Sequence, residues 1–203
     1  MKKILVAAVA VAVMSLPAFA GLSRFSLAVQ GGMAGQEENN LRPGLETGVG
    51  LAFDLGGGLS LNAEVAFWES RSRTSFRKLY DGTLSLAPVS LSVRYEFRPN
   101  AYFIPYVLAG ATYVFTKYRP GPNVSLPPVQ IEQRVNSGTA LHIGLGARIP
   151  LTWRLSFCGE TVYIMRRASG QTIVKEPNQS PRRDDIWVNL HIVLVKFGLR
   201  FDL

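Results

Sequence analysis

The last residues of the chain alternate between apolar and polar side chains up to the carboxyl terminus. The apolar set is Phe197, Leu199, Phe201 and Leu203, and the polar set between them is Lys196, Gly198, Arg200 and Asp202. A period of two residues is the pattern of a β-strand with one apolar face. A soluble domain seldom ends on such a strand, because an exposed apolar edge pairs with other chains. The pattern therefore predicts a terminal strand that pairs within a sheet and faces a lipid phase.

The amino-terminal segment has the three parts of an export signal. Met1-Lys2-Lys3 is basic, Ile4 to Met14 is apolar, and Ala18 and Ala20 are the small residues that signal peptidase requires. An uncleaved membrane anchor is the alternative, but the apolar run is well short of the ~20 residues that span a bilayer as a helix. We therefore expect residues 1–20 to be a signal peptide cleaved after Ala20. Together the two termini point to a bacterial outer membrane.

The remaining residues, 21–203, are the right number for one domain. The single cysteine, Cys158, excludes an intramolecular disulfide framework. Alternation with a period of two predicts eight strands. They are Arg24 to Gly32, Leu45 to Leu55, Leu59 to Trp68, Val89 to Phe97, Phe103 to Thr116, Ala140 to Ile149, Trp153 to Met165 and Ile186 to Leu203.

The connections between these strands alternate in length. They are short after the second, fourth and sixth strands and long after the first, third, fifth and seventh. Outer-membrane barrels have short periplasmic turns, long outer loops and an even number of strands. We therefore expect an all-β fold, an eight-stranded antiparallel up-and-down transmembrane β-barrel formed by residues 21–203.

The two faces of the predicted strands differ in chemistry. One face carries large apolar residues, and the other carries Gly, Ala and charged residues, as in a polar lumen surrounded by lipid. The charged residues are Glu46, Asp54, Glu64, Arg94, Glu96, Arg148, Arg154, Glu160, Lys196 and Arg200. Aromatic residues collect at the strand ends, as in interfacial girdles. The periplasmic set is Phe53, Tyr95, Phe97, Phe103, Trp153 and Phe201, and the outer set is Phe67, Trp68, Tyr113, Phe115, Tyr163 and Trp187.

The centre of the chain resembles a known family. Ala87-Pro-Val-Ser-Leu-Ser-Val-Arg-Tyr-Glu-Phe97, a short turn and Ile104-Pro-Tyr-Val-Leu-Ala-Gly-Ala-Thr-Tyr113 resemble small barrels of the outer membrane protein W and opacity-protein type. The resemblance implies insertion by the outer-membrane assembly machinery, which reads an alternating last strand that usually ends in Phe. Leu203 departs from that final Phe. Functions in these families range over adhesion, envelope integrity and transport of small apolar molecules, so the resemblance locates the protein better than it names a function.

Charged residues at similar heights on late strands predict a polar layer in the lumen. His142, Glu160 and Lys196 lie about eight residues along from the periplasmic turns. Glu160 is expected to face Lys196 on adjacent strands, and Glu64 to face Arg94 in the same way. A His–carboxylate pair can act as base and orienter in catalysis. The lipid A deacylase among small barrels has a His-x-Ser motif, and neither His142 nor His191 is followed by such a serine. We therefore expect a salt-bridged layer and no enzymatic activity.

Other motifs give no site. Gly48-x-Gly50 and Gly144-x-Gly146 lack the third glycine and the helix of a phosphate-binding loop, and they fall on predicted strands. The sequence has no Cys/His cluster typical of a metal site. We expect neither a cofactor nor a metal ion.

The net charge of +8, or +6 without Lys2 and Lys3, is concentrated in the predicted long outer loops. The second of these loops carries Arg71, Arg73, Arg77 and Lys78, and the fourth carries Arg166, Arg167, Lys175, Arg182 and Arg183. Arg geometry suits the phosphates of lipopolysaccharide at this height, whereas nucleic acid is not expected at a cell surface. The six candidate contacts are Arg71, Arg73, Arg77, Lys78, Arg182 and Arg183, and a merely solvated set of loops is the alternative.

These observations favour a monomeric outer-membrane barrel with an envelope or surface-interaction role, or one that binds a small apolar ligand. Its expected partners are outer-membrane lipid and lipopolysaccharide. The alternatives are a narrow transport pore, a lipid A-modifying enzyme and a soluble lipocalin-like carrier. Eight strands leave an interior just wide enough for side chains, which disfavours the pore.

Overall fold

The computed structural model describes residues 25–36, 43–72, 82–97, 102–120, 130–175 and 181–203. The strands are β1 (Phe25–Gln36), β2 (Gly44–Gly56), β3 (Leu59–Ser72), β4 (Gly82–Glu96), β5 (Ile104–Pro120), β6 (Gln130–Val135), β7 (Gly138–Pro150), β8 (Leu155–Met165), β9 (Arg167–Lys175), β10 (Arg182–Asn189) and β11 (Ile192–Asp202). The predicted signal peptide lies outside the described residues. These segments contain no helix with the length and apolar character needed to cross a bilayer.

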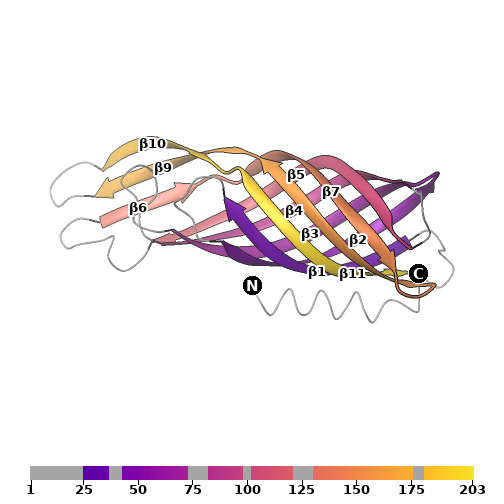
Figure 1. Ribbon diagram of the computed structural model, residues 1–203. Helices are drawn as coiled ribbons and strands as arrows, with labels where there is room; N and C mark the ends of the chain where they lie inside the picture. The colour runs from indigo at the N-terminus through magenta and orange to yellow at the C-terminus, as the bar shows by residue number, and fades with distance from the viewer. Residues whose placement is uncertain (1–24, 37–42, 73–81, 98–101, 121–129, 176–180) are drawn as a thin grey trace.

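Within the described segments, eight strands close an antiparallel barrel in the order β1-β11-β8-β7-β5-β4-β3-β2 (Figure 1). The first and last strands complete the ring, since Ser26 pairs with Asp202 and Gln36 with Ile192. The Leu203 amide donates to the Phe25 carbonyl at 2.9 Å, which extends this pairing to the end of the chain. The predicted fold class is confirmed, and the terminal strand has a neighbour on each side.

A tight glycine turn joins β2 to β3 at the end of the barrel where β1 begins. Gly56, Gly57 and Gly58 have φ angles of 92°, 64° and 87°, a region that side-chain-bearing residues rarely enter. The Gly58 carbonyl accepts a 2.7 Å hydrogen bond from the Glu96 amide, and a Cβ on Gly58 would lie 2.5 Å from the Glu96 carbonyl oxygen. The three glycines thus allow a short turn that is held against the end of β4.

The outward face of the barrel is an apolar band, as lipid contact requires. Its exposed members include Val29, Leu51, Leu61, Val65, Leu91, Val93, Val107, Leu141, Ile143, Leu145, Val195, Phe197 and Leu199. Aromatic residues are exposed at both ends of this band, among them Tyr95, Phe103 and Trp153 at one end and Tyr113, Phe115 and Trp187 at the other. Two assignments were wrong. Trp68 is 1% exposed and points into the lumen, and Arg154 is an exposed turn residue that stacks 4.0 Å from the Trp153 ring.

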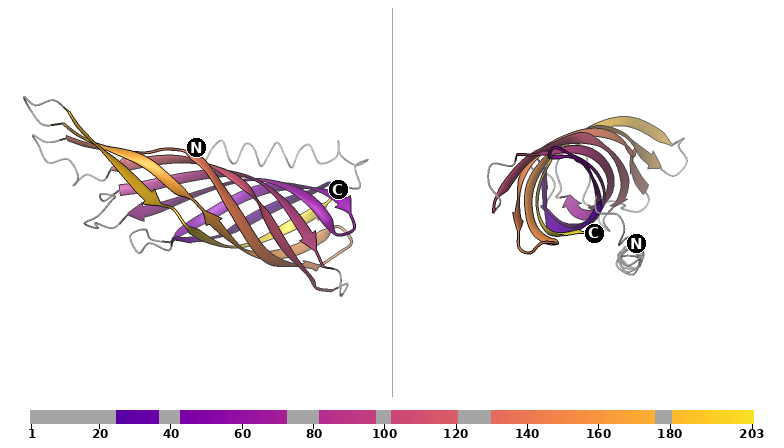
Figure 2. Two further views of the ribbon diagram at one scale, coloured as in Figure 1. Left: turned by 90° about the horizontal axis from the view of Figure 1, so that it is seen from above. Right: turned by 90° about the vertical axis from the view of Figure 1, so that its right-hand side faces the viewer.

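Three barrel strands continue beyond the barrel as a second sheet, in the order β10-β9-β6 (Figures 1 and 2). β6 leads into β7 across Asn136 and Ser137, β8 leads into β9 across Arg166, and β10 leads into β11 across Leu190 and His191. We call these three outer strands the raised sheet. Viewed along the barrel, the raised sheet leans to one side of the ring (Figure 2).

The raised sheet corrects several sequence-based boundaries. β6, β9 and the first half of β10 fall within predicted long loops, and the predicted strand beginning at Ile186 is divided between β10 and β11. β4 begins at Gly82 rather than Val89, and β8 begins at Leu155 rather than Trp153. The outer extensions were missed because strands beyond the lipid lack one uniformly apolar face. The Arg-Arg-Asp-Asp sequence that opens β10 is an example.

Arg166 lies buried at the bend between β8 and β9, and its placement in an exposed loop was wrong. Its guanidinium donates to the Val114 carbonyl at 3.4 Å, to the Thr116 hydroxyl at 3.0 Å and to the Asn136 carbonyl. These groups lie where β6 diverges from β5. The side chain therefore satisfies backbone acceptors that strand pairing would otherwise satisfy.

The lumen is divided into a polar half and an apolar half. The lumen is polar, as expected, in its middle and at the end where the β2–β3 turn lies. Its outer half is instead an apolar core. Its buried side chains are Trp68, Leu84, Leu86, Val114, Ile164, Leu190, Ile192 and Leu194. Side chains from the outer halves of five barrel strands thus meet across the narrow interior, as eight-stranded geometry allows.

Candidate functional site

The five predicted lumenal residues come from five different strands and surround one small cavity. Glu64 lies on β3, Arg94 on β4, His142 on β7, Glu160 on β8 and Lys196 on β11. Each points inward because it occupies the polar phase of its strand's alternation. The cavity has a volume of about 30 Å³, and all five residues line it. We call this cluster the middle layer.

Lys196 is the centre of the middle layer. It is directly opposite Glu160 in the pairing of β11 with β8, and the Nζ to Oε1 distance is 2.7 Å. Lys196 also reaches across the lumen to both carboxyl oxygens of Glu64, at 2.9 Å each. One ammonium group is therefore shared by two carboxylates from different sides of the barrel.

The expected pairing of Glu64 with Arg94 is wrong. In the register of β3 with β4, Glu64 lies opposite Ser90, and Arg94 lies opposite Ser60. Arg94 instead donates to Glu160 Oε2 at 3.4 Å. Spacing along the chain gave the height of each residue approximately, but it did not give the stagger between neighbouring strands.

Tyr106 is a further member of the middle layer that sequence reasoning missed. Its hydroxyl donates to Glu160 Oε2 at 2.9 Å, and the Arg94 guanidinium lies 4.2 Å from its ring centroid. Gly146 makes room for the ring, since a Cβ there would lie 2.6 Å from Tyr106 Cζ. The signal was present, because Tyr106 shares the inward phase of β5 with Leu108 and Thr112.

His142 ends a short row of hydrogen bonds that begins at Ser90 of β4 and passes through Thr112 of β5. Ser90 Oγ and Thr112 Oγ1 are 2.9 Å apart, and Thr112 Oγ1 is 2.8 Å from His142 Nδ1. A hydroxyl beside an imidazole is the arrangement of a nucleophile and its base. Here Thr112 and His142 are 1% and 3% exposed, and the adjoining cavity is far smaller than any lipid or sugar substrate. These hydrogen-bonded groups can bind water, but the cavity beside them has no room for the acyl group of a lipid.

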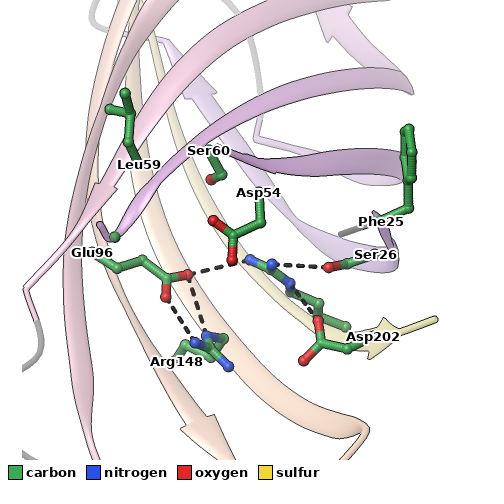
Figure 3. A pocket seen from close by; sticks show the side chains of 10 residues that line it. Phe25, Ser26, Asp54, Leu59, Ser60, Glu96, Arg148 and Asp202 are labelled. Carbon is green, nitrogen blue, oxygen red and sulfur yellow. Dashed lines mark hydrogen bonds and ion pairs between the residues drawn. The ribbon is translucent and has the colours of Figure 1, made fainter. Parts of the chain in front are cut away.

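A second polar cluster, the periplasmic layer, lies nearer the turns and was not predicted as a site. Glu96 binds Arg148 through two hydrogen bonds of 3.2 and 2.7 Å and Arg200 through a third of 3.2 Å (Figure 3). Arg200 also donates to Ser26 and to Asp202 at 2.9 and 3.1 Å. A cavity of about 150 Å³ borders this cluster. The alternation had placed all these charges inward, but their partners come from strands far apart in the sequence.

The predicted lipopolysaccharide contacts are only partly described. Arg73, Arg77 and Lys78 lie outside the described residues, as does the side chain of Arg71, whose backbone belongs to β3. Arg182 and Arg183 are on β10 and not in a loop, so as neighbours on a strand they point to opposite faces. Arg182 is paired with Asp184 at 3.2 Å. The two arginines cannot form a clamp from the same face.

Four exposed basic residues lie on the outward face of β5, β9 and β10. Lys117 and Arg119 follow the exposed pair Tyr113 and Phe115 on β5. The other two members are Arg167 and Arg183, both exposed. We call Lys117, Arg119, Arg167 and Arg183 the outer basic surface. None of the four forms an ion pair with any residue in the described segments, and Arg167 lies 5.3 Å from the Trp187 ring.

A resident metal ion finds no support in the described part of the chain, where no three His, Cys, Asp or Glu side chains form a suitable group. Cys158 is a free thiol in the lumen wall.

Known structures share this architecture. The outer membrane protein OprG of Pseudomonas aeruginosa is 12% identical with a TM-score of 0.68, covering 88% of this chain and 95% of that one. Neisserial surface protein A is 12% identical with a TM-score of 0.57, covering 89% and 97%. Ail of Yersinia pestis, in its complex with the heparin analogue sucrose octasulfate, is 15% identical with a TM-score of 0.51, covering 88% and 95%. At these identities the likeness shows the fold alone.

No curated protein sequence matches the chain. The family model described as the outer membrane protein beta-barrel domain matches residues 6–201. Because this match spans nearly the whole chain and the closed eight-stranded barrel agrees with it, the protein belongs to the outer membrane protein β-barrel family.

Proposed function

We propose that this outer-membrane barrel is a non-enzymatic surface-interaction protein that binds the phosphate groups of lipopolysaccharide beside it. The observation that carries the proposal is the outer basic surface, four exposed cations that form no ion pair within the described segments and that share the outward face of their strands with the aromatic residues Tyr113, Phe115 and Trp187. Aromatic girdles mark the level of the lipid headgroups. We infer that Lys117, Arg119 and Arg167, near these aromatic residues, meet the phosphate groups of lipid A, and that Arg183, farther out on β10, meets the phosphates of the adjoining core sugars.

The chemistry of these residues fits a phosphate ligand. Arg presents a planar fork of donors that matches phosphate oxygens, and Lys supplies a compact positive charge. Arg167 is placed against Trp187, which limits the orientations of its long side chain. Arg71, Arg73, Arg77 and Lys78 are proposed to add to this surface. Ail, which shares the fold, has been crystallised with a polyanionic sugar, and this lends the proposal general support only.

The lumen supports neither transport nor catalysis as the main role. Its outer half is closed by apolar side chains that are nearly all inaccessible, including Leu84, Leu86 and Ile192. The middle layer is held by ion pairs, and the Thr112–His142 pair is buried beside the same cavity of about 30 Å³. We therefore propose that the barrel neither conducts nor hydrolyses lipid, and that its interactions occur on the outside.

Several further features belong to the same proposal. The chain is exported by a signal peptide cleaved after Ala20, is inserted by the outer-membrane assembly machinery, and acts as a monomer. Amino-terminal sequencing of the outer-membrane fraction tests the cleavage, and a mature chain that does not begin at Gly21 would contradict it.

The central experiment compares two double variants of equal charge change in the raised sheet. Arg167→Gln/Arg183→Gln removes two unpaired cations, and Arg134→Gln/Arg182→Gln removes two cations that already pair with Glu132 and Asp184. Lipopolysaccharide retained per barrel is measured after purification at low and high ionic strength. We expect the first variant to retain less lipid at low salt and the difference to shrink at high salt, because exposed charges are then screened.

Three outcomes would contradict the proposal. Equal losses in the two double variants would mean that net charge alone attracts the lipid, and no loss in either would leave the outer basic surface without this role. Steady single-channel conductance in planar bilayers would favour the narrow pore instead.

A further inference from the structure

Glu46 is a buried carboxylate that has no hydrogen-bond or ion-pair partner in the described part of the chain. It points into the lumen from β2, opposite Gly32 of β1 and Trp68 of β3. The residue is 2% exposed, and neither carboxyl oxygen forms a hydrogen bond with any group in the described structure. A buried carboxylate left unpaired is strongly unfavourable in its ionised form. Such a group needs a compensating positive charge or must be neutral.

The charges that face Glu46 do not compensate it. They come from β3, β4, β7, β8 and β11 and are Glu64, Arg94, His142, Glu160 and Lys196. Lys196 is already shared by Glu64 and Glu160, and Arg94 is bound to Glu160. His142 is hydrogen-bonded to Thr112 and has no described carboxylate within ion-pair distance. Three carboxylates therefore face two permanent cations, and Glu46 is the carboxylate left over.

The cavity supplies space beside this group. Glu46 lines the same cavity of about 30 Å³ as the middle layer, and Ser90 and Thr112 line it too. A volume of this size holds about two water molecules, and water occupies small cavities when they are polar. A carboxylic acid has one O–H donor and retains acceptor capacity, so it suits such an enclosure.

We propose that the middle-layer cavity is a proton-binding site, in which Glu46 holds a proton and hydrogen-bonds to enclosed water. Loss of that proton creates a third carboxylate near Lys196, in competition with Glu64 and Glu160. The protonation of Glu46 therefore controls which carboxylates Lys196 binds. This site is independent of the outer basic surface.

The sign of the pH dependence follows from comparing the folded and unfolded chains. In the unfolded chain Glu46 ionises with an ordinary pKa near 4.3. If the folded chain keeps the proton, unfolding releases it above that pH, and stability decreases as the pH rises. One retained proton changes the folding equilibrium by up to about tenfold per pH unit, until the folded protein also loses it.

The test uses Glu46→Gln, which imitates the protonated acid, and Glu64→Gln as the matched control for a paired carboxylate. Urea unfolding in lipid vesicles is measured from pH 5 to pH 9. We expect the wild type to lose stability as the pH rises, Glu46→Gln to lack that loss, and Glu64→Gln to be destabilised throughout. A loss in Glu46→Gln as large as that in Glu64→Gln would overturn the proposal, because Glu46 would then act as an ionised, paired group.

Infrared spectroscopy of the folded barrel gives a second readout that does not depend on the stability of any variant. A protonated carboxyl has a carbonyl stretch separate from that of a carboxylate, and we expect it at neutral pH in the wild type. Its absence would overturn the proposal. Replacing sodium with potassium or choline at constant ionic strength should leave stability unchanged. A selective gain with one metal cation that Glu46→Gln removes would show that a cation, and not a proton, compensates Glu46.

Discussion

Replacing Glu160 with Gln should destabilise the barrel more than any other single loss of a carboxylate in the middle layer. Glu160 accepts hydrogen bonds or ion pairs from Lys196, Arg94 and Tyr106. Removing one partner of a buried ion pair destabilises proteins by roughly 3–5 kcal/mol. Lys196 would keep Glu64 at 2.9 Å, whereas Arg94 would lose its carboxylate. We therefore expect the free energy of unfolding to fall by about 3 kcal/mol, the lower end of this range.

Urea unfolding in lipid vesicles measures this loss. With a urea dependence of roughly 1–3 kcal/mol per M, the midpoint should fall by about 1–3 M. The control is Glu132→Gln in the raised sheet, where exposed pairing with Lys175 contributes about 0–1 kcal/mol. Buried Trp68 is a fluorescence reporter inside the barrel. Adding Arg94→Met to Glu160→Gln should recover part of the loss, because the orphaned cation is removed. Midpoints that fall equally in Glu160→Gln and Glu132→Gln would refute the reasoning.

The remaining predictions concern packing and the bend. Gly146→Ala should lower the unfolding midpoint, because its Cβ would lie 2.6 Å from the Tyr106 ring and from the Gly159 carbonyl oxygen. The control Gly31→Ala should change the midpoint little, because its Cβ would meet nothing closer than 3.6 Å. Equal midpoints for the two variants would show that the structure around Gly146 can move aside. Arg166→Met should leave the closed barrel folded, which is measured as the difference in gel mobility between unboiled and boiled samples. Amide hydrogen exchange in β6 and β9 should become faster, because the Val114 and Asn136 carbonyls lose their donor. Unchanged exchange in those strands would mean that water satisfies these carbonyls equally well.

The barrel itself was predictable because lipid imposes a rule on every spanning strand. Outward residues such as Leu91, Val93 and Leu145 must be apolar, and the alternation they produce gave the strands, their number and the inward charges. The same reasoning placed Lys196 opposite Glu160. Beyond the lipid this constraint disappears, so the pattern of β6, β9 and β10 resembles that of loops.

Two features of the candidate site could not be predicted for a different reason. The partners of Glu64 and Arg94 depend on strand stagger and on reach across the lumen, which chain spacing does not determine. The apolar outer lumen was missed because an inward Leu84 or Ile192 resembles an outward one in a sequence. Trp68 was assigned to the outer girdle for that reason.

The division of the lumen has a consequence for how β11 finds its register. Its outer residues, Ile192 to Val195, are apolar on both faces, so a shift of one position would still place apolar groups against both lipid and core. The same shift would turn Lys196 and Arg200 toward lipid, where an unpaired charge is strongly unfavourable. Correct alignment of the closing strand therefore depends on its two inner charges, and a chain lacking both could close the barrel one residue out of step.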